Sequence, residues 1–379
     1  DQNPASDSRD MLVFCHEMVR QVYAQEAMPA TAVAPTDYRK ARFLIASEQK
    51  ANRKGATTSY LFKLSSFALN LVRKVVRRHE DLQTPANMAG YLPIVGDAIV
   101  GGQEEVKIAA AKLVTTIIRV PLPAIEANSP VYLKEAVNMI KSSTSSTTDS
   151  AKAGLDLVTA ILREKRSVKV KENDIAILLK TLKTDLDEPD RQGILFRFLR
   201  AVIGRKIIIT EVYEVMDEVA RMMITNPDAS VRQSARSAYV QFVLDYPQGK
   251  DRWTKTTGFL IKNLDYEHVA GRHSVMEVLH TLLSKVGDEV LQPLLLTFFV
   301  GLIPRLSSDT DRSCRDMAGV LIGKVYESAD NEREKTLRET VKKWMGAEKK
   351  IAIRKAALQC WAIFVRSSKP ADKIVDGLM

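Results

Sequence analysis

The stretch NPDASVRQSARSAYV, at positions 226–240, carries a pattern that returns along most of the chain. Pro227 and Asp228 open it, and an apolar stripe begins at Val231 with the basic residue Arg232 directly beside it. Apolar residues follow four, seven and eleven positions after Val231, which is the period of an amphipathic helix. A single helix of this kind could arise by chance, whereas its recurrence at a regular interval indicates a structural repeat.

The same arrangement occurs in six clean copies and two blurred ones. In the blurred copies a polar or charged residue stands on the stripe, Arg197 in one and Ser66 and Arg73 in the other. The intervals between copies run from 39 to 45 residues, close to the roughly 40–47 residues of a HEAT or armadillo unit. The basic residues that mark the copies are Lys63, Lys107, Lys152, Arg191, Arg232, Arg272, Arg315 and Arg354.

Each striped helix is preceded by another apolar segment, so the unit is a helix pair. The striped helix is the inner, second one, because a small residue on its stripe lets a neighbouring helix approach closely. Pro93 and Pro293 fall in two of the first helices and are expected to bend them. Only the stretch 206–210, KIIIT, is ambiguous between strand and helix. The sequence therefore predicts an all-α fold, an α-solenoid of about eight HEAT-like or armadillo-like helix pairs.

The expected organisation is an N-terminal helix with an irregular basic segment over 1–58, followed by the solenoid over 59–379. The chain begins without an initiator methionine, and we interpret it as a piece of a much longer protein. Residues 26–59 are either an inserted loop or a place where helices are missing. The polar run SSTSSTTDS, at 142–150, is interpreted as a flexible connection, with a phosphorylated switch as the alternative.

Several repeats carry an aspartate four residues before the marker arginine. Such an aspartate can cap the second helix, and the arginine one turn later can reach the aspartate of the next repeat. We expect this to give an incomplete structural ladder between repeats. Its members are Asp187 with Arg191, Asp228 with Arg232, and Asp311 with Arg315.

The sequence shows no motif typical of catalysis, cofactor binding or metal binding. The sequence has no phosphate-binding GxxxxGK[ST] loop, and the neighbouring His268, His273 and His280 lack zinc-site spacing. Cys314 and Cys360 fall on helix stripes, as small buried hydrophobes do. The apolar run 290–304, which no charge interrupts, is shorter than the ~20 residues that cross a bilayer. We expect no enzyme activity, no cofactor, no small-molecule substrate, no membrane span and no homo-oligomer.

Positive charge is concentrated in two tracts. The chain has 56 basic and 46 acidic residues, and between Arg39 and Glu80 eleven Lys or Arg face only two acids. Phosphate neutralisation would make such a surface bind RNA in a salt-dependent way. Against it, aromatics are only 6% of the chain and show no interleaving with basic residues, so a solvated rim stays the alternative. The candidate residues for RNA or an acidic partner are Arg53, Lys54, Arg73, Lys74, Arg77, Arg78, Lys165, Arg166, Lys169 and Lys171.

Residues 239–283 resemble a known family. The elements concerned are FVLDYPQGK after the Arg232 helix, LDYEHVAGRHSVMEVLH at the next turn, and the preceding stretch 196–236. These are similar to the U3 small nucleolar RNA-associated protein 20 family, also called DRIM. The likeness is close over about 85 residues and extends elsewhere only as the repeat pattern.

The resemblance implies a very large HEAT-repeat protein of the nucleolar small-subunit processome, without a catalytic centre. It implies pre-ribosomal RNA and U3 particle proteins as partners, a role in 18S rRNA processing, and the nucleolus as location. The alternative interpretation is a HEAT-repeat nuclear transport or kinase-scaffold protein that binds peptide partners. Trp253, Trp344 and Trp361 do not recur at the repeat interval, as a peptide-binding ladder would require.

Overall fold

The computed structural model describes residues 56–101, 103–143, 145, 148–183, 189–346 and 348–367. All regular elements within these ranges are helices, and the ambiguous stretch 206–210 is an irregular link that ends in the first residue of a helix. The predicted all-α class is therefore confirmed. Most of the predicted N-terminal segment, 1–58, lies outside the described residues.

The chain divides into two compact units, the first ending at Glu211 and the second beginning at Val212. The first unit contains α3 (Ala56–Arg78), η1 (Glu80–Leu82), α4 (Pro85–Met88), η2 (Ala89–Tyr91), α5 (Leu92–Gly101), α6 (Glu104–Ile117), α7 (Pro123–Ser142), α8 (Asp149–Glu164), α9 (Glu172–Lys183) and α10 (Pro189–Gly204). Helix α11 (Thr210–Thr225) starts at the division. The second unit continues with α12 (Ala229–Asp245), α13 (Lys250–Asn263), α14 (Val269–Lys285), α15 (Asp288–Leu291), η3 (Gln292–Leu294), α16 (Leu295–Ser308), α17 (Arg312–Glu327), α18 (Asn331–Met345) and α19 (Ile351–Ser367).

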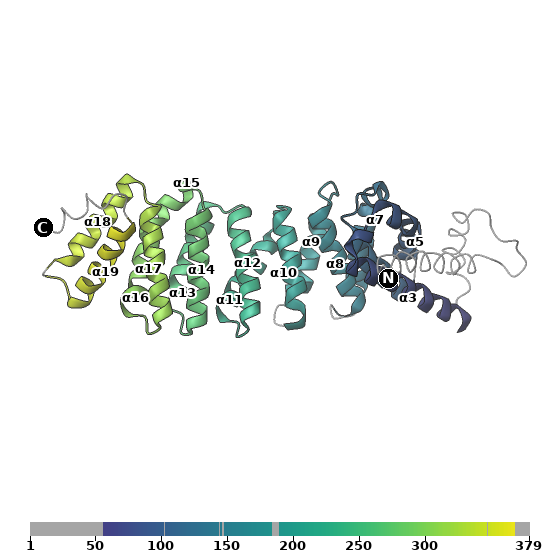
Figure 1. Ribbon diagram of the computed structural model, residues 1–379, viewed down its shortest axis with the longest axis horizontal. Coiled ribbons are helices and arrows are strands. Elements are labelled where there is room, and N and C mark those ends of the chain that lie inside the picture. Colours follow the sequence, from purple (N-terminus) through teal and green to yellow (C-terminus); the bar gives the residue numbers. More distant parts are fainter. Residues whose placement is uncertain are drawn as a thin grey trace, which may run out of the picture. The chain divides into compact units, whose positions relative to one another are not determined.

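Within each unit the helices stack in chain order, each repeat on the next. In the first unit the second helices α3, α6, α8 and α10 pack in succession, and α7 pairs with α8. In the second unit α12, α14, α17 and α19 do the same, and α16 pairs with α17 (Figure 1). Each pair thus buries its apolar stripe against its neighbours, which is the defining property of a helical-repeat solenoid.

The predicted stripes form the core. The small stripe residues Ala110, Ala235, Ala318 and Ala357 are fully buried, as close helix packing requires. Gly154 in α8 serves the same purpose, because a Cβ atom there would stand 2.7 Å from the carbonyl oxygen of Ala136 in α7. Aromatic residues fill the end of the second unit, where the rings of Phe299 and Trp344 stack at 6.0 Å.

Two first helices are broken where proline was expected to bend them. Pro293 lies in the 3-10 turn η3 between α15 and α16, and Pro93 lies in the first turn of α5, directly after η2. Residues Asp288–Ser308 form one stretch that is long and apolar enough to cross a bilayer. Phe298, Phe299 and Leu302 in this stretch are buried against the neighbouring helices, whereas Leu296 and Val300 are exposed, and the expectation of no membrane span stays a prediction.

Candidate nucleic-acid interface

Helix α3 carries the last part of the first predicted basic tract, and the residues of that tract before Ala56 lie outside those that the structure describes. Over 23 residues it contains no acidic side chain, while Leu69, Val72 and Val76 are buried on the side that packs against α6. The opposite side is left to solvent, and Lys74, Arg77 and Arg78 are exposed there. Two of these cations stand in the last turn, where the helix dipole favours positive charge.

The cations of α3 form no ion pair within the described part of the chain. No ion pair joins Lys74, Arg77 or Arg78 to a described acid, and the shielded Nε of half-buried Arg73 has no hydrogen-bond partner. Like charges at four-residue spacing repel one another on a helix. The arrangement therefore favours an external polyanion that would relieve this repulsion.

The second predicted tract, over 163–171, divides into two kinds of residue. Lys165 is buried, and its ammonium pairs with Glu126 of α7. The prediction that Lys165 contacts an external partner is therefore wrong, because the lysine follows α8 directly and the fold uses it to join α8 to α7. Arg166, Lys169 and Lys171 are exposed and remain available.

The end of α10 fixes the same loop. Arg205 donates through Nη1 to the carbonyl of Lys165 at 3.0 Å and through Nη2 to that of Val168 at 2.5 Å. Burial lowers the pKa of Arg205, and the nearby charge of Arg166 lowers it further. Two guanidinium groups thus stand close together beside the loop, which increases the local positive potential. Arg53 and Lys54 lie outside the described residues.

The aspartates of the predicted ladder cap their helices. Asp228 accepts from the backbone N–H groups of Ser230 and Val231, at 2.6 and 3.3 Å. Asp311 accepts from the N–H of Cys314 at 3.0 Å and from the hydroxyl of Ser313. These bonds satisfy donors that a helix N-terminus leaves free.

The arginines of the ladder form different contacts from those expected. Arg232 donates to the carbonyls of Asn226 and Pro227, and Arg315 to those of Asp309 and Thr310, at 2.6–3.2 Å. In these two repeats the arginine closes its own turn instead of reaching the next aspartate. The reason is proximity, because the free carbonyls at the end of the first helix lie only five or six residues before it. Asp187 and the side chain of Arg191 lie outside the described residues.

A real connection between repeats occurs at Arg272, which the sequence analysis treated only as a repeat marker. Its guanidinium donates to the carbonyls of Tyr266 and Glu267 and, through Nη2, to Asp309 Oδ1 of the next turn at 2.8 Å. Arg305 also contacts Asp309, with Nη1 and Oδ2 3.3 Å apart, and pairs with Asp265. The four side chains link the α13–α14 turn to the α16–α17 turn.

The charge of Asp309 is fully enclosed by this network. Burial alone would raise the pKa of Asp309, but the N–H of Asp311 and the guanidinium groups of Arg272 and Arg305 lower it below its usual value. The carboxylate therefore stays ionised and holds both arginines. Sequence reasoning missed Asp309 because it stands two residues before the capping aspartate and does not recur at the repeat interval.

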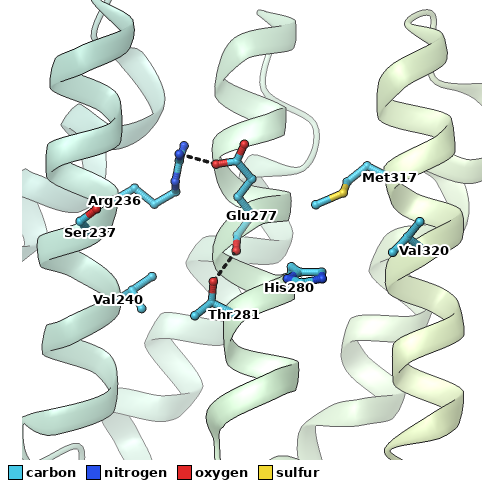
Figure 2. A pocket seen from close by; sticks show the side chains of 8 residues that line it. All are labelled: Arg236, Ser237, Val240, Glu277, His280, Thr281, Met317 and Val320. Atoms are coloured by element: carbon cyan, nitrogen blue, oxygen red, sulfur yellow. Dashed lines mark hydrogen bonds and ion pairs between the residues drawn. The ribbon is translucent and has the colours of Figure 1, made fainter.

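A groove crosses α12, α14 and α17 in the second unit, with a volume of about 410 Å³ (Figure 2). Its floor combines the apolar side chains of Val240, Met317 and Val320 with His280. Arg236 and Glu277 pair across one end, so the groove has little net charge of its own. Such a lining suits a segment of protein better than a polyanion.

One cluster near the α16–α17 turn has the composition of a metal site. His273, Asp311 and Cys314 each bring one ligand atom to within 4.8 Å of the others. However, Asp311 already caps α17, and burial together with the charge of Asp309 raises the pKa of the Cys314 thiol. A metal needs the thiolate and would stand beside the buried guanidinium of Arg272. Helix capping explains the cluster, and the expectation that no metal binds stays a prediction.

Comparison with known proteins identifies relatives over most of the chain. No family model matches it. U3 small nucleolar RNA-associated protein 20 of Schizosaccharomyces pombe is 36% identical over 349 residues, which are 92% of this chain. The chain therefore belongs to the U3 small nucleolar RNA-associated protein 20 family, as its sequence resemblance predicted. The Saccharomyces cerevisiae member is 28% identical over 372 residues, 96% of this chain.

The chain corresponds to only 14% of the length of the S. pombe relative and 15% of the S. cerevisiae one. Among solved structures, karyopherin Kap121p bound to Ste12p is similar over 96% of this chain and 47% of its own, with 12% identity and a TM-score of 0.44. Importin beta is similar over 88% of this chain and 43% of its own, with 15% identity and a TM-score of 0.42. Likenesses at this level say nothing about binding.

Proposed function

We propose that the chain is a non-catalytic architectural segment of the nucleolar small-subunit processome, acting in 18S rRNA processing. Its partners would be pre-ribosomal RNA and proteins of the U3 particle. The observation that carries the proposal is the 36% identity, over 92% of the chain, to a protein named for its association with U3 small nucleolar RNA. Stacked helix pairs suit this role because they offer long surfaces to extended partners.

The exposed cations of α3 are the proposed RNA contact. Lys74, Arg77 and Arg78 have no described counter-ion, and phosphate contacts of this kind position an RNA without reading its sequence. The exposed Arg166, Lys169 and Lys171 of the α8–α9 loop belong to the same unit and would add a second contact.

Association with the U3 particle is tested by immunoprecipitating the full-length protein that contains this chain from nucleolar extract. U3 small nucleolar RNA should be enriched over small nucleolar RNAs of unrelated modification particles. Equal recovery of both classes would contradict the proposed assembly.

The RNA contact is tested with the 379-residue chain carrying Arg73→Ala, Lys74→Ala, Arg77→Ala and Arg78→Ala together. Affinity for pre-ribosomal RNA should fall, and the slope of log affinity against log salt should decrease by up to about 3. The matched control replaces Lys250, Lys255, Lys262 and Lys335, four exposed lysines without ion pairs, and removes the same charge. Equal effects of both sets would show that net charge alone, and not α3, binds the RNA.

A second candidate function is peptide binding, and the groove across α12, α14 and α17 is the observation that favours it. Val320→Glu would place a charge on the α17 side of this groove. Under this function the variant loses protein partners in a pull-down from nucleolar extract while RNA affinity is unchanged. Unchanged protein partners would remove the groove from consideration.

A further inference from the structure

Phe67 stands on the solvent side of α3 with 60% of its surface exposed. It is the only aromatic residue among the large hydrophobic side chains that the described part of the chain exposes. A ring left in water forgoes the stabilisation that burial would give it, so it is available to stack against a partner.

Three basic residues share the face of α3 with Phe67. At about 100° per residue, Lys63, Lys74 and Arg78 all lie within about 40° of the direction of Phe67. A rise of about 1.5 Å per residue puts Lys63 roughly 6 Å before the ring along the helix axis, and Lys74 and Arg78 roughly 10 and 16 Å after it. Lys63, Lys74 and Arg78 are exposed and have no described acidic partner.

We propose that this face of α3, Lys63–Phe67–Lys74–Arg78, binds single-stranded RNA by stacking an unpaired base on Phe67 between phosphate contacts from the three cations. The inference rests on the proposed function and specifies its ligand. An aromatic ring flanked by cations along one line is the combination that binds single strands without sequence preference. This combination is not visible in the sequence itself, because the four residues are separated along the chain and share one face only through the helical period.

The composition of the face favours RNA over a protein partner. The core of a protein interface needs a contiguous apolar patch, depleted in charge. Among the side chains that the structure describes on this side of α3, Leu71 is the only apolar neighbour of Phe67 and is half-buried, Asn70 is polar, and the others are cations. Double-stranded RNA fits less well, because its bases are stacked on one another and are not free to cover the ring.

The test compares Phe67→Ala, Phe67→Trp and a Lys74→Ala/Arg78→Ala double variant of the 379-residue chain, with single-stranded and duplex RNA of the same sequence. Phe67→Ala should weaken single-strand binding roughly ten-fold or more, with the salt slope unchanged and duplex affinity unaffected. Phe67→Trp should keep the affinity. The double variant should lower the salt slope by about 1.4.

Val131→Ala, which truncates an exposed apolar residue on α7 of the same unit, is the matched control and should leave RNA affinity unchanged. Because Phe67 is exposed, its variants should have the circular dichroism and melting temperature of the wild type. Wild-type single-strand affinity in Phe67→Ala, or an equal loss for duplex RNA, would overturn the stacking proposal. If the wild-type chain binds no RNA in a salt-dependent manner, the proposed function itself fails, which is a separate result.

Discussion

Basic residues serve different purposes in α3 and in α14. In α3, Lys74 and Arg78 are exposed and have no described ion-pair partner. In the first turn of α14, Arg272 is buried, with its guanidinium shared between two backbone carbonyls and Asp309 of the α16–α17 turn. A basic residue therefore indicates an external partner only where the fold leaves its charge unpaired.

The largest expected effect comes from the buried side of this comparison. Arg272→Ala would leave Asp309 enclosed with one partner fewer and should lower the free energy of unfolding of the second unit by about 3–5 kcal/mol. Tryptophan fluorescence in urea reports on this unit, since Trp253, Trp344 and Trp361 all lie in it.

The matched control for Arg272 is Arg312→Ala, an exposed arginine whose Nε lies 3.7 Å from Asp316. Its effect should be below about 1 kcal/mol. Neither variant should change RNA affinity at temperatures where both are folded. A loss below about 1 kcal/mol for Arg272→Ala would show that the network is not structural.

The α8–α9 loop contains a buried, paired lysine and an exposed, unpaired one within a few positions. Lys165→Ala should lower the free energy of unfolding by about 1–3 kcal/mol, because it removes a buried donor and leaves Glu126 unpaired. Lys169→Ala, four residues on and exposed, should leave stability unchanged and weaken RNA binding. Thermal melts followed by circular dichroism check the first effect and filter binding checks the second. The reverse pattern would mean that Lys165 is the free residue.

A smaller effect is expected at Lys206, where two substitutions can separate the contribution of backbone strain from that of the side-chain charge. Lys206 follows α10 with φ at 53°, a conformation that disfavours any residue with a Cβ. Lys206→Gly should stabilise the first unit by about 0.5 kcal/mol, and Lys206→Ala should not, although both remove the same charge. Equal melting temperatures for the two variants would show that this turn is not strained.

The smallest effect concerns acid stability. Hydrogen bonds from the Ser313 hydroxyl and the Cys314 N–H lower the pKa of Asp311 to about 2. Because this folded value lies below the unfolded value of about 3.9, the carboxylate contributes stability that is present above about pH 4 and is lost as the pH falls towards 2.

Asp311→Asn keeps a capping oxygen that does not titrate, so its melting temperature should fall less steeply between pH 5 and pH 2 than that of the wild type. Asp316→Asn, on the exposed face of the same helix, should follow the wild-type curve. Parallel curves for Asp311→Asn and the wild type would show that this cap does not contribute to the pH dependence.

The sequence was sufficient for the fold because the fold is repetitive. The stripe recurs from repeat to repeat. The fold can therefore be predicted even where one copy is interrupted, as by Arg197 on the stripe of α10. The capping role of Asp228 and Asp311 was also predictable, since it depends only on residues within three positions.

The contacts of individual charged side chains could not be predicted from the sequence. Lys165 and Lys169 look alike in sequence, and only the packing of α7 against α8 decides which of them is buried. Asp309 meets Arg272 across 37 residues, in a contact that no repeated pattern marks. Phe67 was missed because its exposure depends on which side of α3 packs against α6.

We propose that the unpaired cations of α3 form the RNA contact. Ultraviolet crosslinking of RNA to the full-length protein in intact nucleolar particles, with the crosslinked peptides identified by mass spectrometry, tests it most directly. We predict crosslinks to peptides that span Lys63–Arg78, with none at the α16–α17 turn around Asp309. Crosslinks confined to that turn or to the groove across α12, α14 and α17 would contradict the claim.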